Sequence, residues 1–164
     1  MPLFLADVML KKLARWLRIL GIPTLYAGDF TEDDEEIIKL AMRKKAVLLT
    51  TDRSLNEKAK DYVKVFLIET NDLEEQIKNI VAHFKLRLDK NFPSKTICPQ
   101  CNSPLKTVKR KDVEESVLPA ILIRHRVFWL CTNKKCGKVY WEGTHWDKIE
   151  KTVKRISDTT NPLA

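Results

Sequence analysis

The sequence has no long uninterrupted apolar run. A membrane-spanning helix needs about 18 apolar residues in succession, and no window of this chain approaches that length. The N-terminal region also lacks the layout of a signal peptide. Its most apolar stretch, Leu10–Leu20, is broken by the basic residues Lys11, Lys12, Arg15 and Arg18. We therefore expect a cytoplasmic protein without a membrane span.

Nucleophile–base sets of the Ser-His-Asp or Cys-His kind are not visible either. Each of the four cysteines belongs instead to a metal-binding pattern. A phosphoacceptor-type α/β domain is also disfavoured, because no lysine follows a late predicted strand, where such a site requires one. Catalysis through a covalent serine or cysteine intermediate is therefore not expected.

The cysteines are few and closely paired. Cys98 and Cys101 form one knuckle, Cys131 and Cys136 form a second, and 29 residues separate the two pairs. In a cytosolic protein, two such pairs are typical of a tetrahedral site for structural Zn²⁺, because thiolates bind zinc well and each tight turn delivers two sulfurs. The alternative is two redox or structural thiol pairs without a metal.

The region around the cysteines is predicted to be a small zinc ribbon. Ala120–Leu130 is rich in β-branched and aromatic residues, and Val139–Trp141 follows the second knuckle, so both are predicted strands. Trp146–Ile156 is expected to form a closing helix. Such a ribbon has little hydrophobic core, so zinc should supply much of its folding energy.

Charge is unevenly divided along the chain. The net charge is +8, with 16 Lys and Arg against 15 Asp and Glu in residues 1–92, and 14 against 7 in residues 93–164. The second half therefore indicates a polyanionic partner. Aromatic residues lie among its cations, a combination that suits unstacked RNA bases. For Trp129 and Trp141, a place in the small core of the ribbon is the favoured alternative.

The first half alternates short apolar runs with amphipathic segments. This pattern predicts an α/β fold, with a mostly parallel sheet and helices on both faces, followed by the β-rich ribbon. Asp33 and Glu36 have capping-box spacing, and Gly21 is placed to end the first helix. The predicted strands are 3–6, 23–26, 46–50 and 63–68, and the predicted helices are 9–20, 34–44, 54–60 and one after Asn71 or Asp72. We expect domains at 1–88 and 96–156.

Two acids follow predicted strands. Asp7 comes directly after the first strand, and Asp52 closes the run that contains the third. In open α/β sheets the carboxyl ends of the strands face the ligand crevice, so two acids at these ends indicate a metal site. Taken singly, each is better explained as the N-cap of the helix that follows.

Several motifs together resemble a known family. In order, they are the strand before Asp7, the helix Leu13–Gly21, the acidic opening Asp33–Glu36, the run Leu49–Arg53 and the ending Cys136–Trp146. They resemble a PIN-type nuclease domain joined to a four-cysteine ribbon, as in the Mut-seven C-terminal ribonuclease family. The resemblance extends from about Leu3 to Trp146 and implies a PIN-like, metal-dependent ribonuclease fold.

The resemblance also implies a site for Mg²⁺ or Mn²⁺. Asp7 and Asp52 would be joined by an acid from the start of the second helix, for which Asp34 aligns best and Asp33 competes. Asp72 is a candidate fourth acid, with helix capping as its alternative. Hard divalent ions prefer carboxylate oxygens, and in phosphodiester hydrolysis they orient the phosphate and activate water. Asp7, Asp34 and Asp52 are therefore the predicted catalytic and metal-binding acids.

RNA is the expected partner, and two functions remain open. The first is a Mg²⁺- or Mn²⁺-dependent ribonuclease, expected to be an endonuclease, whose ribbon assists RNA binding. The second is a non-catalytic RNA- or ribosome-binding module with an incomplete acidic site. The predicted RNA-binding residues are Lys11, Lys12, Arg15, Arg53, Lys134, Lys135 and Lys138, and the predicted zinc ligands are Cys98, Cys101, Cys131 and Cys136.

Overall fold

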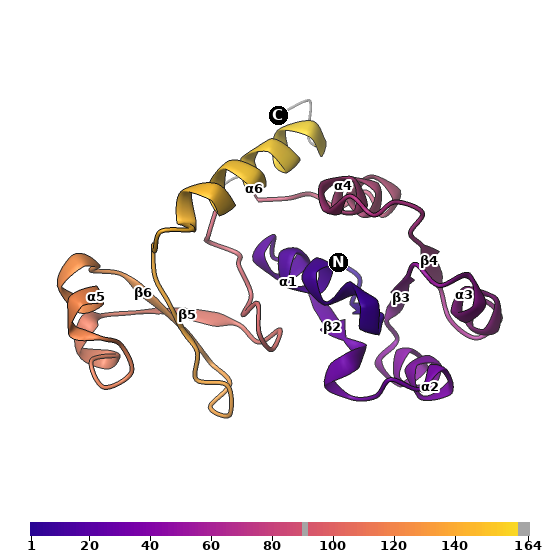
Figure 1. The fold of residues 1–164 in the computed structure, drawn as a ribbon, viewed down its shortest axis with the longest axis horizontal. Helices are drawn as coiled ribbons and strands as arrows, with labels where there is room; N and C mark the ends of the chain where they lie inside the picture. Colours follow the sequence, from indigo (N-terminus) through magenta and orange to yellow (C-terminus); the bar gives the residue numbers. More distant parts are fainter. Residues whose placement is uncertain (90–91, 161–164) are drawn as a thin grey trace.

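Two β-sheets organise the chain in the computed structural model, which describes residues 1–89 and 92–160 (Figure 1). None of the helices in these residues has the length and apolar character needed to cross a membrane. The elements are β1 (Phe4–Ala6), η1 (Val8–Leu10), α1 (Lys11–Ile19), β2 (Thr24–Tyr26), η2 (Ala27–Asp29), α2 (Asp34–Lys44), β3 (Val47–Thr50), α3 (Arg53–Ala59), β4 (Val65–Leu67), α4 (Leu73–His83), β5 (Leu105–Val108), η3 (Arg110–Asp112), α5 (Pro119–Arg124), β6 (Phe128–Cys131), β7 (Val139–Tyr140) and α6 (Trp146–Thr160).

The first sheet is parallel and has the strand order β2-β1-β3-β4. Leu5 in β1 lies opposite Leu25 in β2 and Leu48 in β3. Every residue of the central strands β1 and β3 is buried, as expected for strands that are covered on both faces. The predicted α/β class with a parallel sheet is confirmed.

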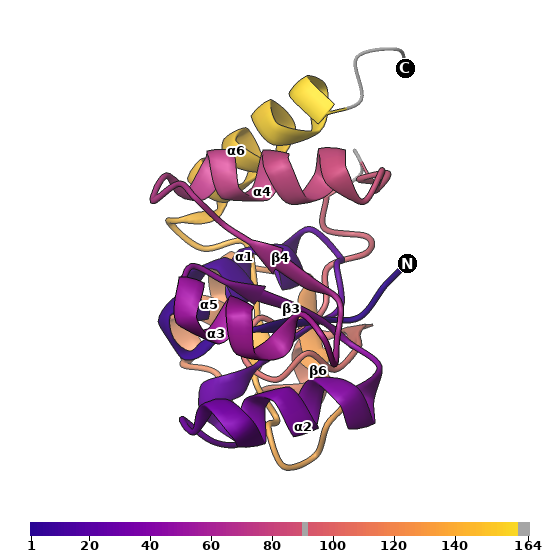
Figure 2. The ribbon, with the colours of Figure 1, turned by 90° about the vertical axis from the view of Figure 1, so that its right-hand side faces the viewer.

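Helices cover both faces of this sheet, because successive side chains of a strand point to opposite faces. Phe4 and Leu49 share one core cluster with residues of α1 and α4. Leu5 and Leu48 share a second with residues of α2 and α3. Figure 2 shows α4 on one side of β3 and β4, and α2 on the other.

The predicted start of α2 and the predicted end of α1 are confirmed by their capping residues, whereas α1 begins at Lys11, two residues later than predicted. Asp33 is the N-cap of α2 and accepts a hydrogen bond from the N–H of Glu36 at 3.0 Å. Gly21, just beyond α1, has φ +77°, a left-handed conformation that favours glycine after a helix. A Cβ at this position would lie 2.7 Å from the carbonyl oxygen of Lys95. Glycine therefore ends the helix and lets a later segment approach closely.

The second sheet is antiparallel and has the order β5-β6-β7. Leu130 in β6 lies opposite Lys106 in β5 and Val139 in β7. The core of this ribbon consists of Val113, Val117 and Phe128, with several partly buried side chains around them. Phe128 is one of the aromatic residues that the sequence places among the cations of this half, but it is fully buried and so not available to stack on a base.

The strand predicted over 120–130 is only partly correct. Pro119–Arg124 forms the helix α5, and β6 begins only at Phe128. Proline suits the first turn of a helix, where its missing N–H is not needed. At the other end, the guanidinium of Arg110 donates to the carbonyl oxygens of Ile123 and His125. These end contacts outweigh the strand preference of the β-branched residues.

The last helix, α6, leaves the ribbon and returns to the first half of the chain (Figure 1). Val153 and Ile156 join the core cluster formed with α1 and α4, and Arg155 forms an ion pair with Glu74 in α4. The helix, Trp146–Thr160, extends past its predicted end at 156. The ribbon is thus connected to packed helices at both ends, while the division into domains 1–88 and 96–156 stays a prediction.

Candidate active site and metal centre

The two central strands mark the point where the strand order of the parallel sheet reverses. From β1 the chain passes to β2 on one side and then to β3 on the other. In open α/β sheets, a point of this kind carries the ligand crevice at the carboxyl ends of the strands. Asp7 follows β1 and Asp52 follows β3, so both acids lie at this end. We call this region the acid edge.

Asp7 is held in a defined orientation. The residue is only 4% exposed, and its Oδ1 accepts a hydrogen bond from the N–H of Val8 at 2.6 Å. Its Oδ2 accepts from the hydroxyl of Thr50 at 2.9 Å, and its backbone N–H donates to the carbonyl oxygen of Leu49 at 3.0 Å. Both carboxylate oxygens therefore have a donor that fixes their direction.

Thr50 connects Asp7 to Asp52. The hydroxyl that donates to Asp7 also accepts a hydrogen bond from the backbone N–H of Asp52 at 3.0 Å. Asp52 is exposed, and its Oδ1 accepts from the N–H groups of Ser54 at 2.7 Å and Leu55 at 3.2 Å. It is thus the N-cap of α3, the alternative considered for it, and the cap uses one of its two oxygens.

Asp34, at the start of α2, forms an ion pair across to α3. Its Oδ2 lies 2.7 Å from Nζ of Lys58. The pKa of Lys58 is raised, first by this hydrogen bond with Asp34 and further by nearby carboxylates that include Asp52. The ammonium group of Lys58 is therefore within electrostatic reach of both acids.

Asp33 and Asp72, the other two acids considered as metal ligands, both cap helices. Asp33 caps α2 through the N–H of Glu36, and Asp72 caps α4 through the N–H of Glu75 at 2.8 Å. Of the acids that open α2, Asp34 is the one that contacts α3. Capping accounts for the positions of Asp33 and Asp72 without a metal.

In this conformation Asp7, Asp34 and Asp52 do not come together as a three-ligand metal site. Among residues 1–89 and 92–160, the only group of three or more Cys, His, Asp or Glu close enough to hold a metal ion is the cysteine group. Asp7, Asp34 and Asp52 instead contact Thr50, Lys58 and the N-terminus of α3, respectively. Their role as Mg²⁺ or Mn²⁺ ligands stays a prediction.

The four cysteine sulfurs suit a tetrahedral ion. All four Sγ atoms lie within 4.8 Å of one another, with Cys98 and Cys136 3.8 Å apart and Cys101 and Cys131 3.4 Å apart. A tetrahedron with Zn–S bonds of about 2.3 Å has edges of about 3.8 Å. The two knuckles therefore face each other at the spacing that Zn²⁺ requires.

The thiols of this cluster differ in acidity. Burial raises the pKa of the Cys101 thiol, but hydrogen bonds from Ser103 and from neighbouring thiols outweigh it and bring the pKa to about 6. Burial raises the pKa of the Cys131 and Cys136 thiols. Cys101 is thus the most acidic of these three thiols, and a bound metal would displace the protons of the cluster.

Arg18 fastens the first knuckle to the parallel sheet. The sequence places it on the polar side of α1, but it is only 3% exposed. Its guanidinium donates to the carbonyl oxygens of Thr24 at 2.7 Å, Pro99 at 2.9 Å and Gln100 at 3.0 Å. Burial lowers its pKa, whereas the charges of Asp29 and of the knuckle thiols oppose this change. A buried cation therefore lies beside the sulfur cluster, where thiolates need counter-charge.

The predicted RNA-binding cations are exposed on both halves of the chain. Arg53 forms an ion pair with Glu69 at 3.4 Å, and Nζ of Lys11 lies 5.7 Å from the ring centre of Tyr26. Arg15 lines a cavity of about 190 Å³ between α1 and the ribbon. Contact with RNA stays a prediction for the exposed set Lys11, Lys12, Arg15, Arg53, Lys134, Lys135 and Lys138.

The roles of four residues in these sites are not predicted from the sequence: Thr50, Lys58, Arg18 and Tyr140. Thr50 carries a usable signal, because a hydroxyl at the end of β3 must lie near an acid that ends the neighbouring parallel strand. Lys58 and Arg18 carry none, since their partners come from other elements. Tyr140, whose hydroxyl lies 3.2 Å from the Cys98 sulfur, is recognisable only after the ribbon has folded.

Comparison with known proteins places the chain in one family. A family model described as Mut7-C RNAse domain matches residues 2–153. No curated protein and no solved structure matches the chain. The matched range contains the acid edge, all four cysteines and the first half of α6. The chain therefore belongs to the Mut7-C RNAse domain family, and its function is related to that of ribonucleases.

Proposed function

We propose that the chain is a PIN-like endoribonuclease that hydrolyses RNA phosphodiester bonds at the acid edge with Mg²⁺ or Mn²⁺. The main support is the Thr50 hydroxyl, which joins Asp7 to Asp52 where the strand order reverses. Membership in an RNase domain family indicates RNA as the class of substrate. Asp7, Asp34 and Asp52 are the proposed ligands and catalytic residues.

The donor chemistry of the acid edge fits a hard divalent cation. Carboxylate oxygens are the ligands that Mg²⁺ and Mn²⁺ prefer, and the two ions keep several waters beside them. Such an ion, when bound, orients the phosphate and activates water for attack on phosphorus. The carboxylates of Asp34 and Asp52 already attract the ammonium of Lys58, and the same field favours a metal cation.

The chain's own residues supply orientation and phosphate contacts. Thr50 and the N–H of Val8 hold the Asp7 carboxylate in one direction, which keeps a first ligand preorganised. Lys11 and Lys12 follow closely after Asp7, and Arg53 follows Asp52 directly. In this proposal these exposed cations bind phosphates near the cleaved bond, where they contribute affinity without sequence preference.

The ribbon has a structural metal and an RNA-binding role in this proposal. Four sulfurs complete a tetrahedron, so zinc there has no open position for catalysis. Lys134, Lys135 and Lys138 are exposed around the second knuckle, where they can contact the RNA backbone. The ribbon therefore grips the substrate while the acid edge carries the chemistry.

A second candidate is a non-catalytic RNA- or ribosome-binding module. The ion pair of Asp34 with Lys58 favours it, because this contact occupies an acid that the nuclease needs. In this alternative Asp52 serves only as the cap of α3, and RNA binding belongs to the basic surface alone.

A cleavage assay separates the two candidates. End-labelled single-stranded and structured RNAs are incubated with the wild type, Asp7→Asn and Asp61→Asn, with and without Mg²⁺ or Mn²⁺. Asp61 is exposed and lies between α3 and β4, so it is a matched control away from the acid edge. The nuclease proposal expects internal, metal-dependent cleavage by the wild type and Asp61→Asn, and none by Asp7→Asn.

RNA binding is measured in parallel, and two results would contradict the nuclease proposal. A wild type that binds RNA but cleaves none of it with either metal is the binding module. If Asp7→Asn cleaves as fast as the wild type, the acid edge is not the active site. Added Mg²⁺ should also raise the melting temperature of the wild type but not of Asp7→Asn, because only an intact site binds the ion.

A further inference from the structure

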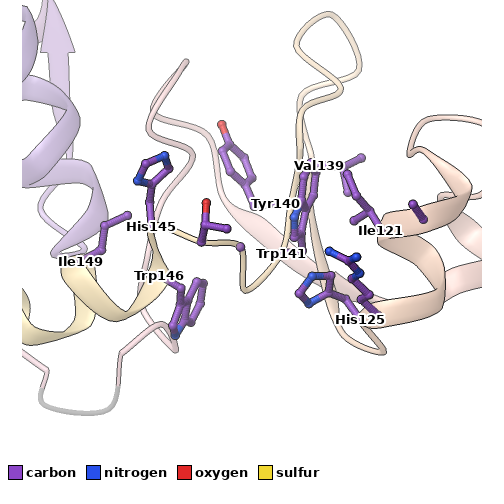
Figure 3. Close-up of a pocket in the computed structure, with 12 residues that line it drawn as sticks. Ile121, His125, Val139, Tyr140, Trp141, His145, Trp146 and Ile149 are labelled. Carbon is purple, nitrogen blue, oxygen red and sulfur yellow. The ribbon is translucent and has the colours of Figure 1, made fainter.

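A cavity of about 530 Å³ lies between the ribbon and the start of α6 (Figure 3). One wall is formed by Ile121, His125 and Trp141, from α5 and the end of β7, and the facing wall by His145 and Trp146. Its volume falls in the range of about 300–1,000 Å³ that is typical of ligand sites. The cavity contains none of the acids of the acid edge and none of the four cysteines, although Tyr140, which lines it, also contacts the Cys98 sulfur.

The lining of this cavity combines aromatic, aliphatic and polar side chains. Trp141 and Trp146 provide ring surface, Arg124 provides positive charge, and His125 and His145 provide hydrogen-bonding groups. Within the described part of the chain, no Asp or Glu lines it. Aromatic and Arg or His side chains together are the means by which proteins stack on unpaired nucleobases and bind their edges. The lining therefore suits a base, and without an acid it does not suit a cationic ligand.

The aromatic walls are fixed without a ligand. Trp146 stacks on Trp129 with ring centres 5.1 Å apart and an angle of 13°, and Phe92 lies 4.8 Å from the same indole. Trp141 packs against the ribbon core that contains Phe128. A site whose rings are already ordered loses little entropy when it binds, which favours affinity.

We propose that this cavity binds one unstacked base of a single-stranded RNA. The proposal rests on the proposed function, which makes RNA the ligand. Charge supports this occupant, because residues 93–164 contain 14 Lys and Arg against 7 Asp and Glu and so attract a phosphate backbone. Glu142 and Asp147 are neighbours in sequence but do not line the cavity. A duplex keeps its bases stacked, so single strands, loops and ends are the expected ligands.

Two oligomers of equal charge isolate the contribution of the base. One is a short single-stranded RNA of mixed sequence, and the other is the same ribose-phosphate chain without bases. Binding is measured by fluorescence anisotropy with zinc retained and without Mg²⁺ or Mn²⁺, so that no cleavage interferes. We expect the abasic chain to bind at least about tenfold more weakly, on the scale of one base stacked on an aromatic side chain.

Ala120→Trp tests the cavity by filling it. Ala120 lines the cavity from an exposed position in α5, so the larger side chain should block a base without disturbing a core. Ala82→Trp is the matched control, since Ala82 is an exposed alanine of α4 outside the cavity. We expect Ala120→Trp to reduce RNA affinity to that of the abasic chain and to leave abasic binding unchanged. Ala82→Trp should change neither affinity.

A second variant removes a group instead of adding one. His145 is exposed, so His145→Ala should fold normally, which zinc content and melting temperature will verify. It should weaken binding of the RNA and leave binding of the abasic chain unchanged.

Two results would overturn the proposal. These are equal affinity of the wild type for both oligomers, and unchanged RNA affinity in Ala120→Trp. If the cavity instead takes an apolar protein segment, the base-free chain will bind as tightly as the RNA. The outcome is independent of cleavage: a protein with base-dependent affinity that cleaves no RNA keeps this proposal and loses the ribonuclease proposal.

Discussion

At the residue scale, each acid of the proposed active site already has a partner. Asp7 is buried and bonded through both oxygens, Asp52 caps α3 through one oxygen, and Asp34 is paired with Lys58. The side chains of Lys58 and Asp34 are 55% and 36% exposed, and pairs this open to solvent are weak because water screens them. A metal ion that binds Asp34 must therefore displace the ammonium group of Lys58.

We predict that Lys58→Met increases the affinity of the acid edge for Mg²⁺. Removing the ammonium leaves Asp34 and Asp52 without their nearby cation, so the remaining carboxylates attract a metal more strongly. The measurement is the melting temperature as a function of Mg²⁺ concentration. The rise should begin at lower Mg²⁺ in Lys58→Met than in the wild type.

Lys60→Met is the control for this prediction. Lys60 also forms an exposed ion pair, with Glu57, which is not a proposed ligand. If Lys58→Met and Lys60→Met show the same response to Mg²⁺, then Asp34 does not bind the ion.

At the element scale, the sequence predicts structure well where one local signal decides it. Asp33 with Glu36 predicts the start of α2, and Gly21 predicts the end of α1. The buried run of β3 predicts a central parallel strand. The helix α5 is missed because β-branched residues outweigh the single signal of Pro119. Burial of Arg18 has no local signal, since its acceptors at Pro99 and Gln100 are distant in sequence.

The two candidate sites also differ in how far the sequence predicts them. The cysteine cluster is predictable in full, because four cysteines in two closely spaced pairs are typical of a metal site. The acid edge is predictable only as a region. Spacing shows that Asp7 and Asp52 end strands, but the contacts of Thr50 and Lys58 depend on how α2 and α3 pack.

We predict that Arg18→Met destabilises the protein by roughly 2–4 kcal/mol, because three carbonyl oxygens lose a charged donor in a buried place. Zinc should also be lost faster, since the carbonyls of the first knuckle are no longer held. The measurements are urea-induced unfolding and the rate of zinc transfer to a chromophoric chelator. Arg15→Met, an exposed arginine of the same helix, should leave both unchanged. Normal zinc retention in Arg18→Met would show that Arg18 does not hold the knuckle.

At the scale of the whole molecule, we expect the ribbon to depend on zinc at the cysteine cluster for its folding, whereas the parallel sheet does not. We predict that Cys131→Ser unfolds β5–β7 while the parallel sheet stays folded, because the sheet has its own two core clusters. Its melting temperature should fall, since α6 shares one of these clusters. Hydrogen exchange is the measurement, with amide protection lost in β6 and kept in β1 and β3. Loss of protection in all three strands would show that the chain folds as one unit.

We also predict that RNA affinity decreases steeply with salt concentration. Phosphate contacts release counterions, with a slope of about 0.7 per contact for single strands. Replacing Lys134, Lys135 and Lys138 together with alanine should weaken binding to many sequences alike and reduce the slope by about 2. Binding isotherms at several salt concentrations measure this slope. An unchanged slope would mean that these lysines do not contact the phosphate backbone.

The packing of α6 against α4 gives the ribbon a second point of attachment to the first half of the chain. Both ends of the ribbon are anchored, by Arg18 at the first knuckle and by Val153 and Ile156 in the core of the first half. A domain on one flexible tether would present RNA to the acid edge at many distances, whereas a doubly anchored ribbon presents it at one. If the proposed base site and the acid edge act on the same RNA, the distance between them is constant. The cut should then fall at a constant number of nucleotides from the base bound in the cavity.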